Sequence, residues 1–99
     1  MAKNKTRTAK MDSQSIDTLP NDKPALYKLL DSTGKNVYTG TAGRGSVRDR
    51  LKDHLPGGKD PVPGAAKVRI EQKDSIEQAQ HTESIIISRS KPRYNKQGK

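Results

Sequence analysis

The chain has 99 residues, of which 28% are hydrophobic, so it supports one domain with a small core. Twenty Lys and Arg against eleven Asp and Glu give a formal charge of +9, which favours nucleic acid as the partner ahead of a membrane surface. The absence of cysteine excludes disulfides, thiolate metal sites and a cysteine nucleophile.

No apolar run approaches the roughly 18 residues that a membrane span needs, and the start of the chain lacks the apolar core of a signal peptide. We therefore expect an intracellular, cytoplasmic protein. Residues 1–22 carry polar side chains without a helical or strand period and are predicted to form a disordered basic arm. The folded domain is expected to span residues 23–95, and residues 96–99 are interpreted as a flexible basic tail.

A β-hairpin opens the expected domain. Residues 25–30 and 36–40 alternate like strands, and the turn-forming sequence DSTGK joins them at 31–35. In the register that this turn favours, Tyr27 and Tyr38 point to the same face, because directly paired residues share a face. That register pairs Tyr27 with Gly40 and Leu29 with Tyr38.

A helix should follow the hairpin, with Ser46 as its N-cap and Asp49 as the capping-box partner. Its apolar residues recur at helical spacing and form a buried stripe. Arg50 and His54, four residues apart, border that stripe, whereas Arg48 points to solvent.

A third strand is predicted at 65–72 and a second helix at 74–90. Glu83 falls inside the isoleucine-rich stripe of this helix. A carboxylate on an apolar face costs several kcal/mol unless it is paired or coordinated. Two explanations stay open: a buried ion pair, for which Arg50 is a candidate, or a Mg²⁺ ligand facing a substrate phosphate.

Four pieces of the sequence follow one another in a distinctive order: ALY at 25–27, YTG at 38–40, RLKDH at 50–54 and ESIIISRSKPRYN at 83–95. With these pieces the chain resembles the GIY-YIG endonucleases over residues 24–95. Ala25 and Leu26 stand where the family has Gly-Ile, and Thr39 stands where it has Ile.

The resemblance implies a small α/β domain in which helices flank a three-stranded antiparallel sheet. It also implies an endonuclease that hydrolyses phosphodiester bonds with one divalent ion, Mg²⁺ or Mn²⁺, and acts on DNA more than on RNA. In the roles that it implies, Tyr27 and Tyr38 line the attacking water and the phosphate, Arg50 and His54 assist them, Glu83 holds the metal, and Asn95 closes the site.

The residues themselves suggest how such a site could work. A free phenol has a pKa near 10, and nearby cations lower it. Arg50, Lys28 and a metal are the candidate cations, and Tyr27, held in mid-strand, is the expected general base. Arg50 is preferred to Arg48 for charge neutralisation because it borders the core beside His54.

Arg44 in the glycine-rich turn is expected to contact nucleic acid, together with Lys28 and Arg48. A homodimer, or a partner chain that supplies specificity or inhibition, is compatible with so small a nuclease. A catalytically inactive nucleic-acid-binding module and a small basic structural protein are the competing hypotheses.

Overall fold

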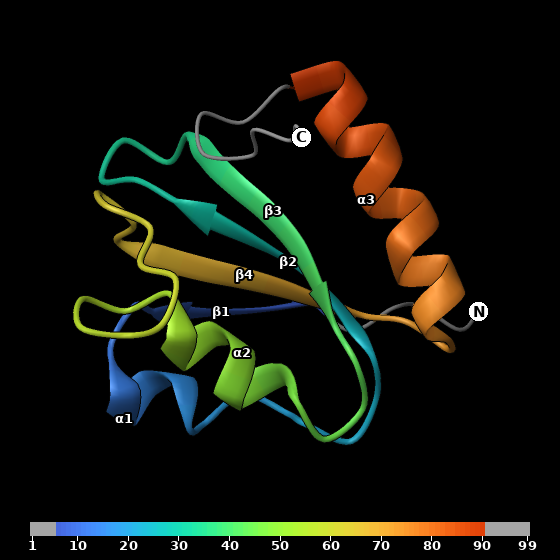
Figure 1. The fold of residues 1–99 in the computed structure, drawn as a ribbon, viewed down its shortest axis with the longest axis horizontal. Coiled ribbons are helices and arrows are strands. Elements are labelled where there is room, and N and C mark those ends of the chain that lie inside the picture. The colour runs from blue at the N-terminus through green and yellow to red at the C-terminus, as the bar shows by residue number, and fades with distance from the viewer. Residues whose placement is uncertain (1–5, 91–99) are drawn as a thin grey trace.

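A four-stranded antiparallel sheet forms the centre of the computed structural model, which describes residues 6–90 (Figure 1). The strand order is β1-β4-β2-β3, so the last strand along the chain lies between the first two. The elements are β1 (Thr6–Lys10), α1 (Ser13–Ile16), β2 (Ala25–Leu30), β3 (Asn36–Ala42), α2 (Val47–Asp53), β4 (Lys67–Gln72) and α3 (Ile76–Ser90).

The β2–β3 hairpin has the predicted register, with Tyr27 opposite Gly40 and Leu29 opposite Tyr38. Its turn is held by the Asp31 carboxylate, which accepts hydrogen bonds from the backbone N–H groups of Thr33 and Lys35 at 2.9 Å each. The two tyrosines therefore project from the same face of the sheet, as the alternation of the two strands predicts.

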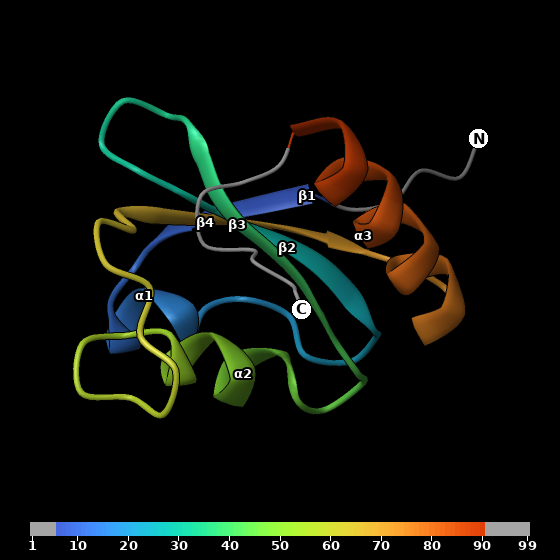
Figure 2. The same ribbon diagram turned by 45° about the horizontal axis from the view of Figure 1, so that its top comes forward.

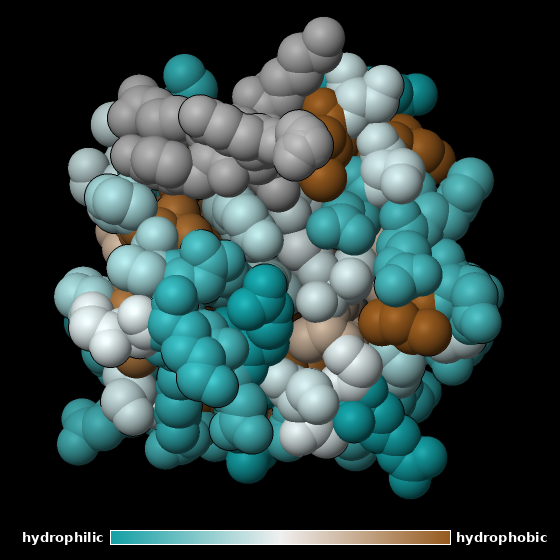
Figure 3. Space-filling view, in the orientation of Figure 1, coloured by the Kyte–Doolittle hydropathy of each residue, from teal (hydrophilic) through white to brown (hydrophobic). Residues whose placement is uncertain are grey.

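The helices lie on both sides of the sheet (Figures 1 and 2). Short α1 and α2 cover the face that carries Tyr27, and this layer holds the main hydrophobic cluster. On the other side, α3 packs against β3 and β2. Figure 3 shows that the surface seen in the view of Figure 1 is mainly hydrophilic, with its larger hydrophobic patches along α3.

The prediction of a disordered arm at 1–22 is wrong for residues 6–22, and the sheet has one strand more than the three predicted. β1 pairs with β4 along its whole length, and Ile16 and Leu19 are buried in the main cluster. The sequence of β1 lacks an apolar period because it is an edge strand with little buried surface. Residues 1–5 and 91–99, including the predicted tail, lie outside the described part.

The start of α2 also depends on this N-terminal segment. The expected cap, Ser46, makes no side-chain capping bond. Instead Oδ1 of Asn21 accepts hydrogen bonds from the N–H groups of Val47 at 2.8 Å and Arg48 at 3.3 Å. A side chain remote in sequence thus satisfies donors that a helix leaves open at its N-terminus.

Within residues 6–90, no helix has both the length and the apolar character needed to cross a membrane.

Because Ile16 is fully buried, Ile16→Ala should lower the free energy of unfolding by about 2–5 kcal/mol. The matched control is Ile85→Ala, since Ile85 is 40% exposed and should change stability by about 0.5 kcal/mol or less. Urea denaturation of both variants measures the difference. Equal effects of the two substitutions would mean that the N-terminal segment is not part of the core.

Candidate active site

Tyr27 lies in the middle of β2 and its ring crosses the neighbouring strand at Gly40. A Cβ atom built on Gly40 would lie 2.5 Å from the Tyr27 hydroxyl oxygen and 2.6 Å from Cζ. Only glycine leaves room for the phenol at this point. Gly40, which follows Tyr38 and Thr39 in the sequence, therefore leaves the space in which the Tyr27 ring is positioned.

His54 holds the hydroxyl of Tyr27. It follows the last turn of α2 and is 1% exposed. Its Nε2 lies 2.8 Å from Tyr27 Oη, and its Nδ1 lies 2.8 Å from the backbone carbonyl oxygen of Asp60. Because a carbonyl can only accept, Nδ1 carries the proton. In neutral His54, Nε2 is then an acceptor, and Tyr27 donates its hydroxyl proton to it.

Burial sets the protonation states of this pair. Desolvation raises the pKa of Tyr27 well above its usual value, and the nearby Tyr38 adds to the rise, while Arg50 opposes it with a smaller effect. The expectation that cations lower this pKa is therefore wrong in its net direction. Burial lowers the pKa of His54, which keeps the imidazole neutral at pH 7.

Tyr38 completes a cluster of three rings. Its ring centroid lies 6.1 Å from that of Tyr27, nearly parallel to it, and 4.8 Å from that of His54. Tyr38 is less buried than Tyr27, and desolvation is the main reason that its pKa is also raised. Two of the three tyrosines of the chain thus meet one histidine at the β2–β3–α2 junction.

Arg50 stands beside these rings, as its place on the helical wheel predicts. Its charge lowers the pKa of both tyrosines in part. Its guanidinium is only loosely paired, at 3.6 Å from Asp53 and 3.9 Å from Asp60, and it is partly exposed. Such a group keeps N–H donors available for an anionic ligand.

Arg48, in contrast, is turned away from the site. Its Nε donates a hydrogen bond of 2.7 Å to the backbone oxygen of Leu19, so it does not simply point into solvent as expected.

Glu83 approaches the junction from α3. It is partly buried and interacts with the side chain of Thr41 on β3, and desolvation raises the pKa of its carboxyl group. Among residues 6–90 no ion pair joins it to Arg50, so the buried-pair explanation has no support in the geometry. Its charge also raises the pKa of Tyr27 and Tyr38, which places it within electrostatic reach of both phenols.

Asp60 is the site residue that the sequence did not single out. Its carbonyl accepts from His54, its carboxylate faces Arg50, and its own N–H donates to the Asp53 carbonyl at 2.9 Å. The preceding loop can fold back this closely because Gly58 has no Cβ atom; a Cβ atom at this position would collide with the Asp53 carbonyl. The Gly-Gly pair before Asp60 was the available signal.

The remaining predicted residues lie apart from the ring cluster or beyond the description. Lys28 projects from the opposite face of the sheet, because successive residues of a strand alternate; it therefore cannot act on Tyr27 at close range as expected. Arg44 is exposed in the loop between β3 and α2. Asn95 lies outside the described residues.

No family model matches the chain. Among curated proteins it is similar to a UvrABC system protein C from Pseudomonas paraeruginosa (strain DSM 24068 / PA7), with 28% identity over 94 residues. The match covers 89% of this chain and 15% of that protein, so the chain spans a small part of the length of this relative.

The buried neutral His54 predicts a pH dependence of stability. Its pKa is lower in the folded chain than in the unfolded one, so the unfolded state binds the proton first as the pH falls. The stability that neutral, buried His54 contributes is fully present above about pH 6.5 and is lost progressively at lower pH. Urea denaturation between pH 5 and 8 should therefore show less stability at the acidic end.

Two variants locate the effect. His54→Gln should flatten the acidic decline, while His81→Gln, at an exposed position on α3, should retain it. The opposite pattern would assign the titration to His81 and contradict a buried neutral His54.

Proposed function

We propose that this chain is a divalent-metal-dependent endonuclease that hydrolyses phosphodiester bonds, with DNA as its main substrate. The observation that carries the proposal is the hydrogen-bonded series from Tyr27 to His54 to the Asp60 carbonyl, which fixes a phenol beside a loosely paired arginine. The similarity to a UvrABC system protein C supports a nuclease-related function, and the +9 charge suits a nucleic-acid substrate.

The raised pKa of Tyr27 favours proton relay over a standing phenolate. As a water molecule attacks phosphorus, its proton passes to Tyr27 Oη while Tyr27 gives its own proton to Nε2 of His54. The phosphorus–oxygen bond then breaks, and the leaving oxygen takes a proton from solvent. His54 afterwards returns the relayed proton to solvent through Tyr27, which restores both neutral groups. Tyr27 is neutral before and after the step, so the buried phenol never carries a full charge.

Asp60 is placed to stabilise the imidazolium that this relay creates. Its backbone oxygen accepts the Nδ1 proton, and its carboxylate oxygen lies 3.9 Å from the same nitrogen. The positive charge on His54 thus forms next to a fixed dipole and an anion, which lowers the cost of the transfer.

Arg50 acts on the phosphate rather than on the water. Its planar guanidinium can donate two hydrogen bonds to phosphoryl oxygens and neutralise the charge that builds there. Asp53 and Asp60 hold it near the tyrosines at distances long enough to leave donors free.

Glu83 is the residue that would hold Mg²⁺ or Mn²⁺. Residues 6–90 contain no group of three or more potential His, Cys, Asp or Glu ligands. One hard carboxylate nevertheless fits, because Mg²⁺ in phosphate-processing sites commonly uses one or two carboxylates plus water and substrate oxygens. When bound, the ion supplies Lewis-acid stabilisation of the phosphate charge.

Tyr27→Phe tests the relay directly. Removing the hydroxyl keeps the ring packing but deletes the proton carrier, so Mg²⁺-dependent plasmid cleavage should fall by about 10²-fold or more. The variant leaves His54 Nε2 without its partner and should cost about 1–3 kcal/mol, so the assay belongs well below its melting temperature. Wild-type cleavage rates in folded Tyr27→Phe would remove Tyr27 from the mechanism. An absence of cleavage by the wild type in Mg²⁺ and EDTA alike would favour the inactive binding module.

Glu83→Gln separates a metal ligand from a structural carboxylate. A neutral amide is easier to bury, and desolvation already disfavours the charged form of Glu83, so the metal-free melting temperature should stay equal or rise. Cleavage in Mg²⁺ should be lost while DNA affinity in EDTA stays near that of wild type. An unfolded Glu83→Gln, or a folded one that still cleaves, would contradict the metal role.

A further inference from the structure

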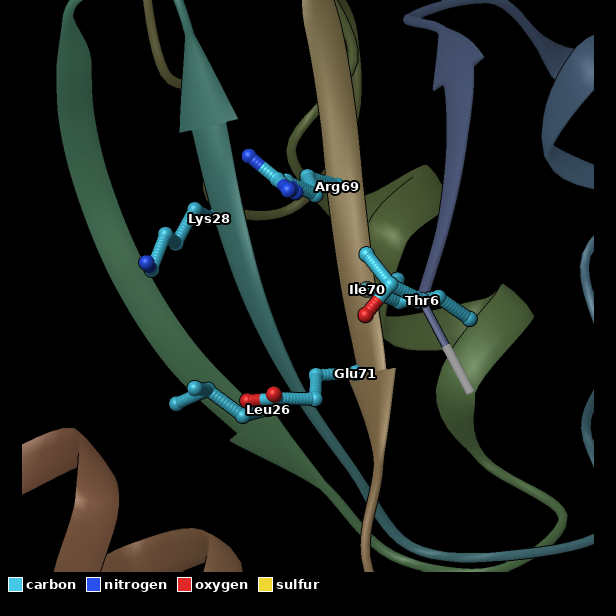
Figure 4. Close-up of a pocket in the computed structure, with 6 residues that line it drawn as sticks. All are labelled: Thr6, Leu26, Lys28, Arg69, Ile70 and Glu71. Carbon is cyan, nitrogen blue, oxygen red and sulfur yellow. The ribbon is translucent and has the colours of Figure 1, made fainter. Parts of the chain in front are cut away.

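The face of the sheet opposite Tyr27 carries opposed cations. Arg69 of β4 stands directly across from Lys28 of β2, and Lys67 of β4 stands across from Lys10 of β1. Figure 4 shows Lys28 and Arg69 on this same face, above neighbouring strands. Like charges directly opposite one another destabilise a sheet, so these two pairs are an electrostatic cost in the isolated chain.

Three of these four cations are not neutralised within residues 6–90, whereas Lys10 interacts with the charge of Asp12. Lys28, Lys67 and Arg69 make no side-chain hydrogen bond or ion pair with another described residue, and Lys67 and Arg69 are exposed. Glu71 shares the face, but its carboxylate lies 3.2 Å from Lys73. The sequences 1–5 and 91–99 contain no Asp or Glu that could supply the missing negative charge.

A hollow on this face has room for a phosphate group. Its volume is about 150 Å³, the space of about five water molecules. Lys28 and Arg69 line it from one end, Thr6 adds a hydroxyl group at its rim, and Glu71, which is ion-paired with Lys73, lines it at the other end (Figure 4). Cations combined with threonine hydroxyls are the usual donors to nucleic-acid phosphates.

The chemistry of the face favours nucleic acid over a lipid surface. An interfacial helix binds a membrane through apolar side chains that enter the bilayer, in addition to attraction between basic residues and anionic lipids. Among residues 6–90 the only exposed large hydrophobic residue is Ile85, which belongs to α3 and does not join the cation rows. A second copy of this chain is also unsuitable, because each copy is strongly positive.

We propose that the part of this sheet face beyond α3, defined by Lys10, Lys28, Lys67 and Arg69, binds the phosphate backbone of a second nucleic-acid segment. The Tyr27 ring cluster lies on the other face of the sheet, because Tyr27 and Lys28 are successive residues of one strand. On this proposal each chain takes two duplex segments, one at each face. The inference concerns binding alone and does not require the chain to cleave nucleic acid.

Binding stoichiometry tests this second surface in EDTA, where metal-dependent cleavage is suppressed. Short duplexes of about ten base pairs, one helical turn, are titrated against the protein at low salt. Wild type should bind two duplexes per chain, and the double variant Lys67→Gln/Arg69→Gln should bind one. The matched control Lys23→Gln/Lys35→Gln removes the same charge from exposed positions elsewhere and should still bind two.

The weaker binding event should also change its salt dependence. Each lost phosphate contact lowers the slope of log affinity against log salt concentration by about 0.9 in magnitude. The binding of the second duplex to wild type should therefore have a slope about 1.8 steeper than any second-duplex binding that remains in the double variant. One duplex per wild-type chain, or two per chain in Lys67→Gln/Arg69→Gln, would overturn the proposal. A third result would also overturn it: Lys67→Gln/Arg69→Gln no longer binds phosphatidylserine vesicles but still binds two duplexes. That result would assign the face to lipid binding.

Discussion

The site depends on one buried hydrogen bond, between the hydroxyl of Tyr27 and Nε2 of His54. Three separate features of the chain make it possible: the missing side chain at Gly40, the end of α2 at His54, and the loop that returns the carbonyl of Asp60. Burial makes this bond strong and directional, but the same burial forbids a stable phenolate. Geometry and protonation are therefore fixed by one cause, which is the exclusion of water from the phenol.

Much of this arrangement could be predicted because it is encoded locally. A strand has a period of two residues and a helix one of 3.6, so alternation is enough to put Tyr27 and Tyr38 on one face and to set Arg50 and His54 beside the core. The hairpin register follows from a short turn, which leaves few alternative pairings. These inferences hold because each compares residues within one element or across one tight turn.

The parts that escaped prediction depend on partners distant in sequence. β1 is polar and acquires its structure from β4, while Asn21 caps a helix that begins 26 positions later. Asp60 acts chiefly through its backbone carbonyl, which no side-chain pattern reveals. The direction of the Tyr27 pKa shift was likewise unpredictable, because it depends on how completely the folded chain excludes water from the phenol.

The pairing of β1 with β4 has a consequence for how the chain acquires its structure during synthesis. β1 is made before the other strands of the sheet, yet its only neighbour in the sheet of residues 6–90 is translated after the hairpin and α2. Such non-local pairing cannot form until both strands are free, and it slows folding. During this interval Ile16 and Leu19 have no complete core to enter, so the emerging chain exposes apolar groups that chaperones recognise. A site that needs β2, β3, α2 and the return of Asp60 is also late to assemble, because it stays incomplete until Asp60 has been made.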